Sequence, residues 1–138
     1  MTSTPNKAQP PAVGWTRHVW PWLLLLAVGV LAATLRYGVI EPVATAELCG
    51  SGHGPAWCPA RQWLVQSFLN NTYGIAALVA AGLALVVKQP WAAWLAAALG
   101  LFALELYCFE AGALALLIGC LRLLRIQAQI LPRLVPAG

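Results

Sequence analysis

The chain has 138 residues, of which 61% are hydrophobic and only 9% are charged, and its formal net charge is +4. A soluble domain contains about 25% charged residues, so a surface this poor in charge is expected to face lipid. The few basic residues lie beside hydrophobic segments and form no patch with interleaved aromatic residues, which excludes a nucleic-acid-binding protein. Because about 20 apolar residues cross a bilayer, four spans use nearly the whole length and leave no room for a separate soluble domain.

The first 18 residues are polar and rich in proline, and they predict a disordered cytoplasmic tail. The first span follows at about residues 19–39. Pro21 stands near its start, where the missing N–H is of little consequence. The apolar run continues past Leu35 to Arg36 instead of stopping at a short signal-peptide core, so the span is expected to remain uncleaved.

The remaining chain predicts three further spans and a mixed C-terminal tail. The apolar run from Trp91 to Leu121 would make a single helix about 46 Å long, well beyond the hydrocarbon core of about 30 Å. Two shorter helices joined by a tight turn near Cys108 therefore fit better. The predicted segments are span two at about 62–87, span three at about 91–107, span four at about 110–126 and a cytoplasmic tail at 127–138.

Basic and acidic residues separate to opposite ends of the predicted spans. Six of the eight lysines and arginines flank or connect the spans on the side of the N-terminus, whereas all four glutamates lie on the other side. An excess of Lys and Arg marks the cytoplasmic side of a membrane protein. The predicted fold is an all-α membrane protein, a four-transmembrane-helix antiparallel bundle with both termini in the cytoplasm and an outer loop at about residues 40–61.

The outer loop carries Cys49 and Cys58, which enclose eight residues that include three glycines and a proline. Glycine lets the chain turn back on itself, and an oxidising periplasm would preserve a disulfide here, so a structural disulfide is the first interpretation. A redox-active pair lacks the Cys-X-X-Cys spacing that tunes a thiol pKa, and a zinc site with His53 lacks a fourth ligand. Both remain open as alternatives, whereas Cys108 and Cys120 are expected to be buried free thiols.

Polar residues gather at the outer end of the predicted spans. Three of them follow one another at i, i+4 and i+7 in span two and therefore share one helical face. Ionisable groups at membrane depth indicate a function, such as binding a quinone head group, a small polar substrate or a proton. Polar contacts between helices also stabilise bundles, by about 0.6 kcal/mol each, and this structural role is the preferred interpretation. The predicted cluster comprises Arg36, Gln66, Asn70, Tyr73, Glu105 and Glu110.

Small residues recur three and four positions apart along spans two, three and four. Such faces let helix backbones approach one another closely, either inside the bundle or against a partner subunit. The predicted packing positions are Gly74, Ala77, Ala81, Gly100, Gly112 and Gly119.

Several chemical signatures are missing from the sequence. The two histidines, His18 and His53, lie outside the spans, so the bundle cannot hold a bis-histidine haem. The sequence has no aspartate, no nucleotide-binding or zinc-protease motif, and no setting for a Ser-His-Asp triad. We therefore predict no catalytic residue, no metal and no cofactor, with a quinone as the one ligand left open.

Three segments resemble a family of small four-span inner-membrane proteins of proteobacteria with a two-cysteine periplasmic loop. They are the stretch Arg36-Tyr37-Gly38-Val39-Ile40-Glu41-Pro42 at the end of span one, the Trp57-Cys58 step in the outer loop, and Leu121-Arg122-Leu123-Leu124-Arg125 at the end of span four. The resemblance covers roughly residues 35–125. It implies the topology and the bacterial inner membrane, and it implies no activity.

These features favour a non-catalytic integral membrane subunit or accessory protein of a larger bacterial membrane complex, for example a respiratory one. Its expected partners are the lipid bilayer and other membrane subunits or a second copy of the chain. One alternative is a thiol–quinone redox protein that uses Cys49, Cys58 and Cys108. Another is a small oligomeric transporter or channel subunit built around Asn70 and Glu105.

Overall fold

The structure is a computed structural model that describes residues 12–134, and the whole described part is helical in character, without strands. The predicted tail residues 1–11 and 135–138 lie outside the described residues. The elements, in chain order, are α1 (Ala12–Leu35), a π-helical turn η1 (Arg36–Ile40), α2 (Val43–Gly50), α3 (Cys58–Leu69), α4 (Thr72–Val86), α5 (Pro90–Glu105) and α6 (Phe109–Leu134).

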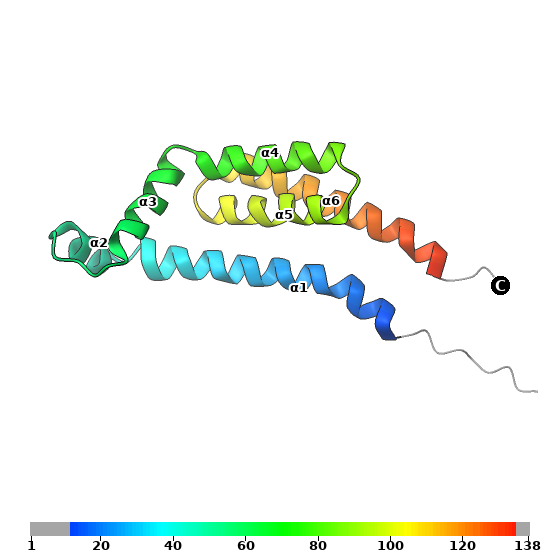
Figure 1. Ribbon diagram of the computed structural model, residues 1–138, viewed down its shortest axis with the longest axis horizontal. Helices are drawn as coiled ribbons and strands as arrows, with labels where there is room; N and C mark the ends of the chain where they lie inside the picture. Colours follow the sequence, from blue (N-terminus) through cyan, green and yellow to red (C-terminus); the bar gives the residue numbers. More distant parts are fainter. Residues whose placement is uncertain (1–11, 135–138) are drawn as a thin grey trace, which may run out of the picture.

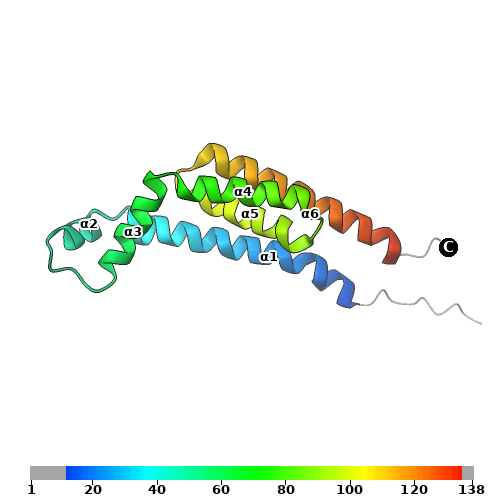
Figure 2. The same ribbon diagram turned by 45° about the horizontal axis from the view of Figure 1, so that its top comes forward.

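Four long helices lie side by side, and two short ones cover one end of them (Figure 1). Helix α5 is central, since it contacts α6, α4 and α1, whereas α1 packs mainly along α5. Helices α2 and α3 form a cap at one end of the long helices, and both views place the start of α1 and the end of α6 at the opposite end (Figure 2). We call these the outer end and the inner end.

The helices at both chain ends are longer than the sequence predicted. Residues 12–18 and 127–134, expected to belong to tails, are helical in the structure. The two segments are joined where they leave the predicted spans. Gln127 donates from Nε2 to the carbonyl oxygen of His18 at 3.1 Å and accepts from Nε1 of Trp22 at 3.2 Å.

The predicted span over 62–87 is not one continuous helix, because α3 and α4 meet at an angle of 64°. The break falls at Asn71, whose φ of 55° is in the left-handed region. Asparagine adopts this conformation more readily than most residues, and its side chain competes with helical hydrogen bonding. The outer loop also differs from the prediction, because it contains helix α2, which begins directly after Pro42.

The chain reverses at residues 106–108, between α5 and α6, where the sequence predicts the division between spans three and four. Tyr107 has a φ of 69°, which makes the reversal abrupt. By length and hydropathy, one described helical segment, Trp15–Ile40, could cross a membrane, and α3 with α4 would make a second if the bent pair is one span. Helix α5 is apolar but shorter.

The interior of the described bundle is built from small side chains. Twelve of its sixteen buried hydrophobic residues are alanines, and it buries no polar or charged residue. Large apolar side chains point outward instead, and Leu26, Val79 and Val86 are 68%, 66% and 81% exposed. A water-soluble protein buries its large apolar residues preferentially, so this distribution is the reverse of the usual one.

The six predicted packing positions all lie in the interior of the bundle. Helices α5 and α6 approach each other backbone to backbone, and a Cβ added to Gly112 would lie 2.6 Å from the amide nitrogen of Leu104. Added Cβ atoms would likewise meet backbone between Gly100 and Leu116 and between Gly119 and Ala97. These glycines therefore serve contacts inside the chain.

Candidate functional site

The structure brings together only part of the predicted polar cluster. Arg36 donates from a terminal nitrogen to the backbone oxygen of Glu105 at 3.1 Å, and the same nitrogen lies 3.9 Å from the Glu105 carboxylate. These contacts join the end of α1 to the end of α5. The ion pair is partly shielded from water, since the two side chains are 18% and 27% exposed.

The other four predicted residues lie apart from this pair. Gln66 and Asn70 are exposed, because the bend at Asn71 turns α3 away from the long helices. Tyr73 packs its ring edge-on against Phe102, with ring centres 5.5 Å apart. Glu110 is exposed at the start of α6. The i, i+4, i+7 relation assumed a continuous helix, and it fails where that helix breaks.

Two residues that the sequence analysis left out of the cluster complete it. Glu41 accepts from Nε of Arg36 at 3.1 Å and from the hydroxyl of Tyr107 at 2.8 Å. The guanidinium carbon of Arg36 lies 4.2 Å from the centre of the Tyr107 ring, a cation–π contact. We call Arg36, Glu41, Glu105 and Tyr107 the outer polar cluster.

Part of this cluster could have been predicted from the sequence, because Arg36 and Glu41 are five positions apart, the spacing of one π-helical turn. The amide of Glu41 donates to the carbonyl oxygen of Arg36 at 3.0 Å, which closes a π-helical turn. Arg61 braces the same turn from α3, donating to the carbonyl oxygens of Val39 at 3.0 Å and Ile40 at 3.1 Å. The turn thus fixes the cap to the long helices.

The hydrogen bond from Tyr107 and the contact with Arg36 both favour the charged form of Glu41, and they lower the pKa of its carboxyl below the ordinary value. The unfolded chain has the ordinary pKa. The resulting stabilisation is therefore full above the ordinary pKa and is lost as the pH falls through the lowered one.

Replacing Glu41 by glutamine should accordingly flatten the acidic part of the pH–stability profile. Thermal unfolding of the purified chain in detergent, followed over a series of acidic pH values, measures this effect. Glu47→Gln is the matched control, because Glu47 is an exposed glutamate of α2. If both variants keep the wild-type profile, the outer polar cluster has no electrostatic role in stability.

The outer cap is closed by a disulfide between Cys49 at the end of α2 and Cys58 at the start of α3, with Cα atoms 5.5 Å apart. Gly54 lies inside the enclosed loop, where an added Cβ would come within 2.6 Å of the Cys58 sulfur. A larger residue would therefore disturb the closure. The two remaining cysteines, Cys108 and Cys120, are free.

Cys108 lies far from the disulfide. It belongs to the α5–α6 turn, near the end of α3, where the rings of Phe68 and Tyr107 are 5.9 Å apart. Cys58 is at the other end of α3, and ten helical residues separate it from Phe68 by about 15 Å. Paired cysteines have Cα atoms within about 7 Å, so this geometry disfavours direct thiol–disulfide exchange with Cys108.

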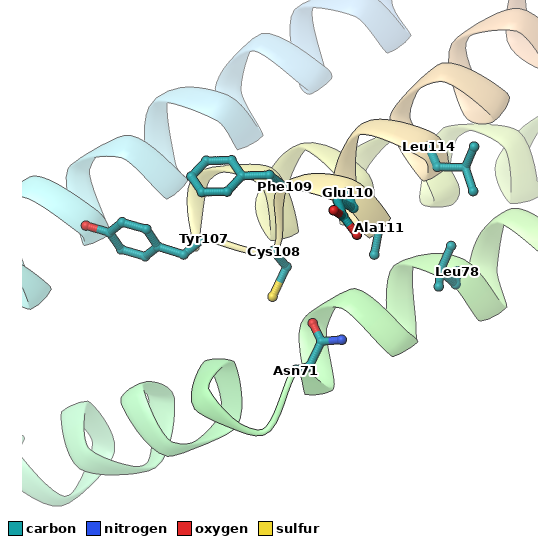
Figure 3. A pocket seen from close by; sticks show the side chains of 8 residues that line it. All are labelled: Asn71, Leu78, Tyr107, Cys108, Phe109, Glu110, Ala111 and Leu114. Carbon is teal, nitrogen blue, oxygen red and sulfur yellow. The ribbon is translucent and has the colours of Figure 1, made fainter.

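A groove of about 560 Å³ opens beside the outer polar cluster, between the start of α4 and the start of α6 (Figure 3). Asn71 and Leu78 face Ala111 and Leu114 across it, whereas the Tyr107 ring points toward α1. Its lining combines apolar side chains with an amide and a carboxylate, and its volume is in the range of small-molecule pockets. The full lining is Asn71, Leu78, Tyr107, Cys108, Phe109, Glu110, Ala111 and Leu114.

The two non-glycine residues with positive φ in the described chain, Asn71 and Tyr107, both line this groove. Such backbone conformations persist only where the surroundings hold them, and they often occur at functional sites. Among the described residues, no group of three His, Cys, Asp or Glu side chains is arranged to hold a metal ion.

The chain matches no protein-family model, no curated protein and no solved structure.

Proposed function

We propose that this chain is a non-catalytic integral membrane subunit or accessory protein of a larger complex in the bacterial inner membrane. The observation that carries the proposal is the distribution of side chains by size. Alanines fill the interior and large apolar residues cover the outside of the described bundle. Small interior residues let membrane helices pack closely, and an apolar exterior is stable only where lipid or another protein covers it.

The proposed arrangement has four spans with both termini in the cytoplasm. The four long helices that lie side by side support the number of spans, and the basic residues at the inner end support the orientation. Helices α4 and α5, with 15 and 16 residues, are about 22 and 24 Å long, somewhat short of a hydrocarbon core of about 30 Å. The longer α1 and α6 lie in the same bundle, and bilayers adapt to short spans by thinning. The exposed Trp91 near the start of α5 and Tyr107 after its end suit the two interfaces.

The contacts among the charged groups at the outer end support a non-catalytic role. Arg36 and Glu41 neutralise each other, and the Tyr107 hydroxyl donates to the same carboxylate. A structural role accounts for charges that are paired in this way, because their partners come from η1 and from the end of α5. The outer polar cluster then joins the cap to the bundle.

Helix α1 provides the surface on which we expect a partner subunit to bind. Of its described side chains only Leu25 and Ala32 are buried, whereas Leu26, Val30 and Leu31 are 68%, 57% and 59% exposed. The predicted small-residue faces of α4, α5 and α6 are occupied within the chain. A neighbouring subunit would therefore meet large apolar residues, with α1 contributing the most open helix.

Purification of the tagged full chain from its host membranes in mild detergent tests the proposal. We expect other membrane proteins to copurify in a fixed ratio. Replacing Leu26 and Val30 by alanine should weaken that association. Ile75 and Val79 on α4, which are similarly exposed and also four positions apart, provide the matched control. A chain that elutes alone and pure, or that is found outside the membrane fraction, contradicts the proposal.

A further inference from the structure

A second pocket, of about 400 Å³, lies at the inner end of the bundle, opposite the cap. It lies between the α4–α5 turn and one face of α6, whose contributing residues recur three and four positions apart. The lining combines three cationic side chains with two isoleucines and an amide: Lys88, Arg122, Arg125, Ile126, Gln129 and Ile130.

Arg122 is held in place by the end of α4. It donates from Nε to the carbonyl oxygen of Ala84 at 3.0 Å and from a terminal nitrogen to that of Leu85 at 2.9 Å. These carbonyls belong to the last turn of the helix, where backbone acceptors lack helical partners. A guanidinium has five N–H donors, so three remain for a ligand in the pocket. Arg122 is thus a cation fixed before any ligand binds.

Lys88 and Arg125 bring two further positive charges to the pocket, and both side chains are exposed. The described residues provide neither of them with a hydrogen bond or an ion pair. All four acidic residues of the chain lie at the outer end, in η1–α2 and around the α5–α6 turn. Among the described residues no carboxylate lies beside the three cations, and an anion between them would lower their mutual repulsion.

The apolar part of the pocket indicates what kind of anion fits. Ile126 and Ile130 line it, and Val86, at the end of α4, is 81% exposed. A phosphate that carries acyl chains satisfies the cations and the apolar side chains together. Basic pockets between membrane helices on the cytoplasmic side bind anionic lipid head groups in this way.

We propose that this inner pocket binds the head-group phosphate of an anionic phospholipid of the cytoplasmic leaflet, with Lys88, Arg122 and Arg125 around the phosphate. The proposal rests on the membrane placement proposed above. It adds a ligand class, anionic phospholipid, and a binding site, the inner pocket. It also gives a reason why basic residues concentrate at this end.

Native mass spectrometry of the full chain in neutral detergent tests the site. Phosphatidylglycerol and phosphatidylcholine with identical acyl chains are added at equal concentration, and the wild type is expected to retain the anionic lipid preferentially. Arg125→Gln should reduce that preference about fivefold, because each basic residue near an anionic head group contributes roughly that factor. Arg17→Gln is the control, since Arg17 is exposed on α1 near the same end and does not line the pocket.

Three results would overturn the proposal: no preference in the wild type, an equal loss in Arg17→Gln, or displacement of the lipid by inorganic phosphate in excess. The second result would show diffuse attraction to the basic end, and the third a site for free phosphate. Fractionation of the cells that produce the chain distinguishes the loss of the lipid site from the loss of the proposed membrane function. A chain in the membrane fraction without lipid preference overturns only the lipid site.

Discussion

Replacing Gly112 by alanine is expected to destabilise the bundle by about 2 kcal/mol, within the range for overpacking a tight interface. The added Cβ would lie 2.6 Å from the amide nitrogen of Leu104 and 2.8 Å from the carbonyl oxygen of Gly100. Both are backbone atoms, which cannot rotate away as a flexible side chain can. The α5–α6 pair would have to separate, and the alanine contacts along it would loosen.

Gly82→Ala is the matched control for this prediction. Gly82 is exposed in the middle of α4, and an added Cβ there would meet nothing within 4 Å. It should leave stability unchanged or raise it slightly, since alanine favours helix more than glycine does. Thermal unfolding in detergent compares the two variants directly. Equal midpoints would show that α5 and α6 do not approach as closely as the structure indicates.

Removing the disulfide is expected to free the cap while leaving the bundle intact. A disulfide that closes a loop of about ten residues lowers the entropy of the unfolded segment, and this stabilises the folded cap by about 3 kcal/mol. Cys49→Ser should therefore accelerate hydrogen exchange in α2 and in the first turns of α3 by up to about 100-fold. Helix α5 should keep its protection, because its contacts are with α1, α4 and α6.

Cys120→Ser provides the control, since Cys120 is a free cysteine of α6 far from the cap. Reduction of the wild type should reproduce the Cys49→Ser pattern. An unchanged exchange rate in α2 would show that the cap does not depend on the disulfide. Equal loosening of α5 would show that the cap and the bundle unfold as one unit.

Much of the helical organisation follows from local patterns. The reversal near Cys108 could be predicted from the length of the apolar run, and the interior positions of Gly100 and Gly112 from their spacing. The pairing of Cys49 with Cys58 in the structure follows from a short, glycine-rich connection. Each of these features depends on residues close to one another in the sequence or on a repeat along one helix.

The features that could not be predicted from the sequence are of two kinds: hydrogen bonds between distant segments, and a backbone conformation that interrupts a helix. The Tyr107 hydroxyl reaches Glu41 across 66 positions, and Gln127 reaches His18 across 109. The bend at Asn71 depends on a single left-handed residue inside a segment that the sequence predicts as one span. The predicted polar face required a continuous helix through this segment. The left-handed φ angle of Asn71 breaks that helix, so Gln66 and Asn70 lie away from Arg36.

Labelling with a membrane-impermeant maleimide tests how the chain is arranged across the membrane. Ala44→Cys places a thiol on the exposed surface of α2, and Gln89→Cys places one in the α4–α5 turn. In intact cells the first should react and the second should not, while both should react after lysis. Labelling of Gln89→Cys in intact cells, or protection of Ala44→Cys there, would contradict the account.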